Sequence, residues 1–280
     1  MSSNKSPVID NPWAALRRFT DARIALGHAG VSLPTTAHLA FQLAHAQARD
    51  AVHRALDAPR VARALSASIE GKTAHCLQLH SAAAGRDIYL RRPDLGRTLD
   101  AASREVLTAP NMLEHRAQGR PYDLALVVAD GLSALAIEQN AAPFLAVLLR
   151  RIGTERWRIA PVCVVQQGRV AIGDEIAELL GAKSVVVLIG ERPGLSSPDS
   201  MGLYLTWMPR VGVTDSSRNC ISNVRPAGLG LEDAAHRLHY LLSEMHKRQL
   251  SGVGLKDDTM QAPEGDSGRI DAPGGNFLLE

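Results

Sequence analysis

The residues with the clearest capacity for chemistry lie in three polar segments, each directly after an apolar run that predicts a β-strand. These segments are Asp130-Gly-Leu-Ser-Ala, Gln166-Gln-Gly-Arg-Val-Ala-Ile-Gly and Gly190-Glu-Arg-Pro-Gly. Ligands of open parallel sheets bind beyond the carboxyl ends of the strands, so the segments predict a ligand site. None of them matches G-x-G-x-x-G or G-x-x-x-x-G-K-[ST], the patterns of dinucleotide and nucleoside triphosphate sites. They therefore predict a site without naming its ligand.

Ser133 offers a second kind of chemistry. A strand that runs into Asp130-Gly-Leu-Ser-Ala-Leu approaches the G-x-S-x-G nucleophile elbow, and Asp and His residues follow in the order of α/β hydrolases. Leu135, however, occupies the place of the last glycine, which normally allows close packing of strand and helix. A hydrolase that uses Ser133 is therefore an alternative, which a serine-directed phosphonate probe would detect.

Histidines form two further patterns. His236, His239 and His246 have a spacing that suggests a metal site, but no clustered carboxylate or cysteine in the sequence completes a ligand set. We interpret them as part of a polar helix face and predict no metal site. The polar stripe from His38 to His53 predicts a solvated face, with contact to another subunit as the alternative.

The elements that must position these residues begin with an arm of two predicted helices. The first is expected over 12–26, and the second follows Thr35 and Thr36, which can cap it. Leu39, Leu43 and Ala46 recur at helical spacing on this second helix. Because two helices alone bury little apolar surface, we expect the arm to pack on another part of the assembly.

From about residue 74 the pattern changes to apolar runs separated by helical stretches, which is typical of βαβ units and a mainly parallel sheet. The continuously apolar runs predict strands that helices cover on both faces. We expect strands at 124–129, 159–165 and 184–189, a weaker one at 203–208, crossover helices at 136–149 and 174–180, and a long helix at 231–250.

Composition narrows the class of protein. The 280 residues are 45% hydrophobic and 21% charged, as in an ordinary globular protein. No apolar run resembles a signal peptide or approaches the roughly 20 residues that span a bilayer, so we expect neither export nor a membrane span. A net charge of +2 without a dense basic stripe, and 4% aromatic residues, disfavour nucleic acid as a partner. Cys76, Cys163 and Cys220 form no C-x-x-C motif, which favours the reducing cytoplasm.

Several long motifs occur in the order in which one known family carries them. They are TDARIALGHAG with SLPT, LAFQLAHAQARDAV, YLRRPDLGR, ADGLSA, GERPGLSSPDS, and NCISNVRPAGL with SGVGL. Over roughly residues 12 to 255, the chain resembles the small subunit of adenosylcobalamin-dependent ethanolamine ammonia-lyase. The resemblance implies a hetero-oligomer of large and small subunits that converts ethanolamine to acetaldehyde and ammonia by a radical route. It also implies that adenosylcobalamin lies between the large subunit's barrel and a Rossmann-like domain of this chain.

Carried over motif by motif, the resemblance assigns cofactor contacts to Val170 in GRVAIGD, Glu191 in GERPG and Cys220 in NCISN. Glu191 could accept hydrogen bonds from corrin amides or ribose, Val170 could form an apolar wall, and Cys220 is small enough for close approach. Arg169 and Arg192 could bind the phosphate of the nucleotide tail. The D-x-H-x-x-G motif of base-off cobalamin proteins is absent from the sequence. We therefore expect base-on cofactor, with no cobalt ligand and no catalytic residue from this chain.

We predict an α/β fold with a Rossmann-like, mainly parallel sheet flanked by helices. The chain divides into a helical N-terminal arm (1–70), a cobalamin-binding domain (71–255) and a flexible tail (256–280). Its partners are the large subunit and further copies of the small subunit, in the cytoplasm. Relatives with a longer segment before NPWAALRRFTDAR use it for entry into a bacterial microcompartment, so encapsulation stays open. Besides the Ser133 hydrolase, the alternative is an assembly module that leaves the cobalamin affinity of the large subunit unchanged.

Overall fold

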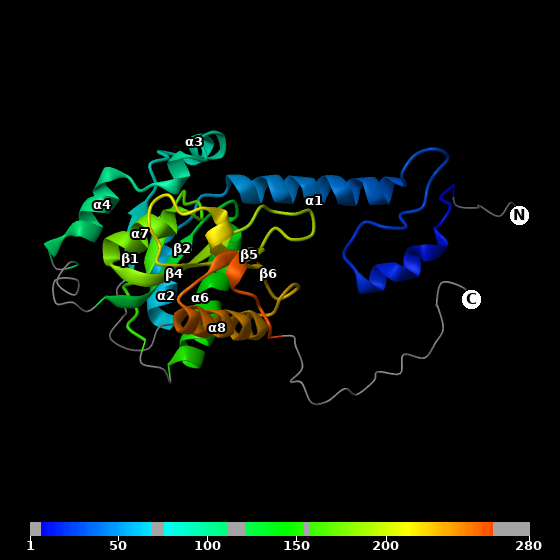
Figure 1. Ribbon diagram of the computed structural model, residues 1–280. Helices are drawn as coiled ribbons and strands as arrows, with labels where there is room; N and C mark the ends of the chain where they lie inside the picture. The colour runs from blue at the N-terminus through cyan, green and yellow to red at the C-terminus, as the bar shows by residue number, and fades with distance from the viewer. Residues whose placement is uncertain (1–6, 69–75, 111, 113–120, 154–156, 260–280) are drawn as a thin grey trace, which may run out of the picture.

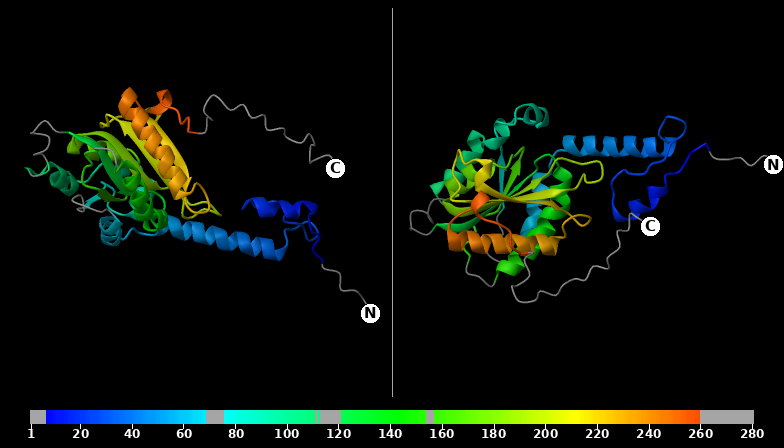
Figure 2. Two further views of the ribbon diagram at one scale, coloured as in Figure 1. Left: turned by 90° about the horizontal axis from the view of Figure 1, so that it is seen from below. Right: turned by 45° about the vertical axis from the view of Figure 1, so that its right-hand side comes forward.

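The computed structural model describes residues 7–68, 76–110, 112, 121–153 and 157–259. An α/β body contains a six-stranded sheet with helices on both faces, and the long helix α1 (Thr35–His53) extends away from it (Figure 1). The N-terminal 3-10 helix η1 (Pro12–Phe19) lies near the far end of α1 in each view of Figures 1 and 2. Among the described residues, no helix combines the length and apolar character needed to cross a membrane.

The sheet has the strand order β1-β3-β2-β4-β5-β6. Its members are β1 (Leu77–His80), β3 (Cys163–Gln166), β2 (Tyr122–Ala129), β4 (Ala182–Gly190), β5 (Met201–Trp207) and β6 (Arg218–Val224). The first four strands in this order run parallel, whereas β5 is antiparallel to β4 and β6 is antiparallel to β5. The α/β class is therefore confirmed, but the sheet is mixed, because a short connection returns the chain beside β4 without a crossover helix.

Helices cover the two faces of the central strands with separate apolar cores. On one face, α2 (Ala58–Ser68), α6 (Ala134–Ile152) and α8 (Leu231–Arg248) pack against alternate residues of β2. On the other face, α4 (Ala101–Thr108) and α7 (Ile172–Leu180) pack against the residues between them. Because β2 is covered on both sides, six of its eight residues are buried, as its continuous apolar run predicted.

The predicted crossover helices are confirmed, with bounds that differ by a few residues. Asp174 and Glu175 lie in the first turn of α7, and Gly181 ends the helix at φ +69°, a left-handed conformation that glycine adopts without strain. The predicted strand at 159–165 is shorter than expected, since only Cys163–Gln166 forms β3. The sequence patterns did not predict β1, β6, α2, α4 or the six-residue helix α3 (Arg86–Arg91), because these elements are short or mixed in polarity.

The N-terminal segment differs from the prediction in detail. In place of a helix over 12–26 there is the shorter η1, which ends because Thr20 is extended. Thr35 and Thr36 do not cap α1; Pro34 holds the N-cap position and makes no side-chain hydrogen bond. Further short 3-10 helices are η2 (Leu95–Arg97), η3 (Asp215–Ser217) and η4 (Gly252–Gly254). The predicted boundary at residue 70 and most of the predicted tail, 260–280, lie outside the described residues.

Candidate functional site

The neighbouring strands β2 and β3 lead into helices on opposite faces of the sheet, α6 after β2 and α7 after β3. Such a divergence opens a crevice at the carboxyl ends of the two strands. The segments that follow the strands meet there, because the backbone N–H of Gly168 donates to Asp130 Oδ1 at 3.0 Å. Two of the three polar segments that the sequence singled out are thus joined at one edge of the sheet.

Val170 lies in the turn that leads from β3 into α7 and is half-buried against the core on that face. It lines a hollow of about 600 Å³. The other walls come from η2 and its neighbours, from Tyr204 on β5 and from the loop over 211–215. Val170 therefore presents an apolar side chain to an open space, as a ligand wall requires.

Glu191 follows directly on β4 and is held in one orientation by two donors. Its Oε2 accepts hydrogen bonds from Ser200 Oγ and, at 3.1 Å, from the backbone N–H of Asn223. Its other oxygen, Oε1, lies over Gly202 of β5, where an added Cβ would come within 3.0 Å of it. That Cβ would also lie 3.2 Å from the ring of Tyr204, so the carboxylate and the phenol are close neighbours.

Cys220 lies on β6 directly opposite Tyr204 on β5. Burial raises the pKa of both the Cys220 thiol and the Tyr204 hydroxyl. Both therefore stay protonated at neutral pH and can act as neutral donors beside the Glu191 carboxylate. Despite its partly buried sulfur, Cys220 as a residue is exposed to solvent.

Tyr204 is the residue that adjoins all three predicted positions, and it was not among the predicted site residues. It lines the hollow with Val170, adjoins Glu191 across Gly202 and pairs with Cys220. A signal was present: Leu203 and Leu205 alternate with Tyr204, which places the tyrosine on the opposite face of the strand. Which face stays accessible depends on where α7 and α8 pack, and no local pattern reports that.

Arg218 and Asp174, two charged residues that line the hollow, form an ion pair with each other. Arg218 is buried and donates to Asp174 Oδ1 at 2.8 Å, to Thr206 Oγ1 at 3.1 Å and to the Val213 carbonyl at 2.8 Å. Burial raises the pKa of Asp174, and the hydrogen bond from Arg218 opposes that rise. This pair anchors β6 to α7, and Arg97 and Arg169 are further cations at the wall of the hollow.

Arg169 also lines a second hollow of about 430 Å³ together with Arg192. His45 and Arg49 of α1 belong to the same lining. The two arginines that were predicted to bind a phosphate therefore line one hollow, although they are 23 positions apart in the sequence. Four basic side chains around one hollow favour an anionic group.

Ser133 has a structural role. Its hydroxyl donates to the Pro198 carbonyl at 2.6 Å and accepts from the backbone N–H of Ala136 at 3.1 Å, which caps α6. The residue is completely buried. Because the hydroxyl is enclosed and engaged in both directions, the hydrolase alternative fails.

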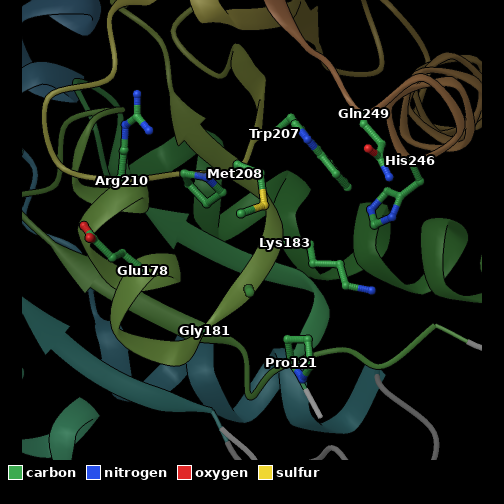
Figure 3. A pocket seen from close by; sticks show the side chains of 11 residues that line it. Pro121, Glu178, Gly181, Lys183, Trp207, Met208, Arg210, His246 and Gln249 are labelled. Atoms are coloured by element: carbon green, nitrogen blue, oxygen red, sulfur yellow. The ribbon is translucent and has the colours of Figure 1, made fainter. Parts of the chain in front are cut away.

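A third hollow, of about 790 Å³, lies at the opposite edge of the sheet (Figure 3). Trp207, Lys183 and His246 line it, and none of the predicted site residues does. Their polar groups are engaged: Lys183 Nζ lies 2.9 Å from Asp123 Oδ1, and His246 Nε2 lies 3.0 Å from Ser184 Oγ. His246 also packs edge-on against two tryptophan rings, including that of Trp207, so it stabilises the core at this edge.

Comparison with known proteins gives one consistent result. A family model described as ethanolamine ammonia-lyase light chain (EutC) matches residues 10–256, which include every element from η1 to η4. The chain is 56% identical to the ethanolamine ammonia-lyase small subunit of Azotobacter vinelandii, over 99% of this chain and 98% of that one. It is 56% identical to the same subunit of Ralstonia nicotianae, over 98% and 96%, and 57% identical to that of Pseudomonas aeruginosa, over 96% and 95%.

Proposed function

The chain belongs to the ethanolamine ammonia-lyase light-chain family, and on this basis we propose that it completes, with a large subunit, a binding site for adenosylcobalamin. As a small subunit, it is one component of a lyase that works as a hetero-oligomer. When bound, the cofactor would supply the radical chemistry, and this chain would hold and orient it. One observation carries the proposal: Val170 and Glu191, which follow β3 and β4, and Cys220, within β6, all adjoin Tyr204 on the side of the sheet that α7 covers.

The residues present fit the chemistry of a cobalamin. A corrin needs apolar walls and hydrogen-bond partners for its amide rim, and Val170 and Tyr204 supply walls to a hollow of about 600 Å³. Ser200 and Asn223 both bond Oε2 of Glu191, so Oε1 is left to accept from an amide N–H. The phosphate of the nucleotide tail would bind between Arg169 and Arg192, in the hollow of about 430 Å³. We assign no cobalt ligand to this chain, in keeping with base-on cofactor.

The arm supports a place in a larger assembly. Leu39 and Leu43, which the helical spacing would bury, are each 61% exposed, and α1 buries only Ala44 and Ala51. No residue of η1 is buried, and its Trp13 and Phe19 are exposed. Exposed apolar surface of this extent marks an interaction site. We assign it to the large subunit, because α1 also contributes to the hollow that Arg169 and Arg192 line.

We further propose that the body is Rossmann-like in its β2-α6-β3-α7-β4 part, and that the complex contains further copies of this chain and works in the cytoplasm. The divergence of β2 and β3 supports the Rossmann-like description, since it is the feature that places ligands in such folds. Encapsulation in a microcompartment is not assigned.

The test is ethanolamine-dependent acetaldehyde formation with adenosylcobalamin and the large subunit, comparing this chain with its Glu191→Gln variant. We expect activity only in the mixture. The variant should raise the apparent KM for cofactor about tenfold, because a hydrogen bond to a carboxylate becomes one to a neutral amide. Glu105→Gln, on the exposed surface of α4, is the matched control.

Equal cofactor requirements for Glu191→Gln and Glu105→Gln would contradict the assigned contact. Cobalamin binding to the large subunit, measured by equilibrium dialysis with and without this chain, separates a shared site from pure assembly. An affinity that does not change on adding the chain would favour the assembly module and reject the proposal.

A further inference from the structure

Arg86, the first residue of α3, lies between the end of α1 and the segments that follow β2 and β3. Its side chain is only 10% exposed. Nε donates to the carbonyl of Val52, in the last turn of α1, at 2.7 Å. Nη1 donates to the carbonyl of Gly131 at 2.8 Å and lies 3.3 Å from both Asp130 Oδ2 and Gln167 Oε1. One guanidinium thus joins the end of α1 to the segments that follow β2 and β3.

The segment after β3 is held to α3 by a second set of contacts. The hydroxyl of Tyr89, which is completely buried, donates to the carbonyl of Gly168 at 3.0 Å. Arg169 Nη2 donates to the carbonyl of Tyr89 at 3.2 Å. The guanidinium groups of Arg86 and Arg169 both lie over the Tyr89 ring, at 4.9 and 4.1 Å from its centroid. Val170, the next residue, is therefore fixed in position by α3.

Stability alone does not explain this arrangement. Asp130 is completely buried opposite Arg86, and buried ion pairs contribute little net stability because both charges lose their hydration. Nη2 of Arg86 is buried without a hydrogen-bond partner among the described residues, which is a further cost. The role of the guanidinium is instead to join chain segments. Its several donors bond α1, the segment after β2 and the segment after β3 at once, which a compact ammonium group could not do.

We propose that Arg86 is a positioning residue that couples α1 to the segment carrying Val170, an inference that rests on the proposed cofactor site. A partner that docks on α1 fixes the Val52 carbonyl and, through Arg86, the turns after β2 and β3. Coupling between two sites is reciprocal, so docking of the large subunit and binding of the cofactor strengthen each other.

The test uses Arg86→Met, Asp130→Asn and the double variant. Each single change leaves one buried partner uncompensated, whereas the double variant removes both charges, so its Tm should lie above the Tm of either single variant. The change Asp130→Asn keeps an oxygen that can accept from the backbone N–H of Gly168. We expect the double variant to retain an apparent cofactor KM raised about tenfold, with kcat at saturating cofactor nearly unchanged.

A second readout does not depend on the cofactor. Amide hydrogen exchange of the full chain should be faster over 167–171 and over the last turn of α1 in the double variant. Arg91→Met is the matched control, because Arg91 lies on the same helix with its side chain 76% exposed. It should leave Tm, KM and exchange unchanged.

Two results would overturn the coupling: a cofactor KM of the double variant equal to that of the parent complex, or unchanged amide exchange over 167–171 in the double variant. If the parent complex shows no cofactor-dependent activity, the proposed function fails. The exchange measurement on the chain alone then decides the coupling between α1 and the turn after β3.

Discussion

At the scale of single residues, the proposed cofactor site has the Glu191 carboxylate beside neutral and cationic donors. Glu191 is oriented by Ser200 and Asn223, while the hydroxyl of Tyr204 and the thiol of Cys220 are kept protonated by burial. A fixed acceptor next to fixed donors suits a ligand whose rim carries amides. Val170, Glu191 and Cys220 stay predictions as cofactor contacts, and Tyr204 joins them on geometric grounds.

Asp130 makes stability depend on pH. Burial raises its pKa from 3.8 to about 6, against the opposing effects of Arg86 and three backbone amides. Between these two values the folded chain binds more protons at this site than the unfolded chain. The free energy of unfolding therefore falls as pH rises through this window, by on the order of 3 kcal/mol, and the effect is complete above the folded pKa.

The Asp130→Asn variant removes this titration. The free energy of unfolding of the parent and the variant can be measured by urea unfolding at several values between about pH 4 and pH 7. The difference between the two chains should change with pH below the folded pKa of about 6 and stay constant above it. The comparison cancels the titration of all other groups. Parallel stability curves for the two chains would show that Asp130 does not titrate there.

At the scale of elements, the site depends on how closely the turn after β2 approaches the end of β4. The backbone N–H of Leu132 donates to the carbonyl of Gly190 at 2.9 Å. A Cβ on Gly190 would lie 2.1 Å from the carbonyl oxygen of Ser133 and 2.5 Å from that of Asp130. Both atoms belong to the backbone, so they cannot rotate away as a flexible side chain would.

Gly190→Ala should therefore push the two segments apart. We expect a loss of about 1–3 kcal/mol in unfolding free energy, as for other overpacked sites, together with a raised cofactor KM because Glu191 is the next residue. Gly85→Ala is the matched control, since its Cβ would meet only Asp87 Oδ1, at 3.5 Å. The urea midpoint and the cofactor KM are measured for both alanine variants. Equal urea midpoints and equal KM values for Gly190→Ala and Gly85→Ala would contradict the close-packing argument.

At the scale of the whole molecule, the sheet separates two apolar cores that have different relations to the proposed cofactor site. The core under α8 stabilises the body, and the core under α7 also supports the turn that carries Val170. Leu238 on α8 and Ile176 on α7 are both completely buried. They are thus matched positions in layers with different relations to the site.

Leu238→Ala and Ile176→Ala should each cost about 2–5 kcal/mol of unfolding free energy, because each leaves a cavity. Only Ile176→Ala is expected to raise the apparent cofactor KM of the complex, since α7 begins beside Val170. Measurements below the unfolding temperature of both variants separate the two effects. An equal rise in KM for both would mean that general destabilisation, and not the position of α7, controls cofactor binding.

The α/β class, the central strands and the family could all be predicted from the sequence. Continuous apolar runs indicate strands that are buried on both faces. The family can be recognised from the order of its motifs along the sequence, without knowledge of any tertiary contact. Tertiary contacts were needed to establish that β5 runs antiparallel to β4 and to β6 and that Leu39 and Leu43 remain exposed. They also show that Tyr204 adjoins the predicted contacts and that Arg86 joins α1 to the segments after β2 and β3. Periodicity indicates which face of a helix or strand a residue occupies. Whether that face is buried or exposed depends on segments that are distant in the sequence, so the local pattern cannot predict it.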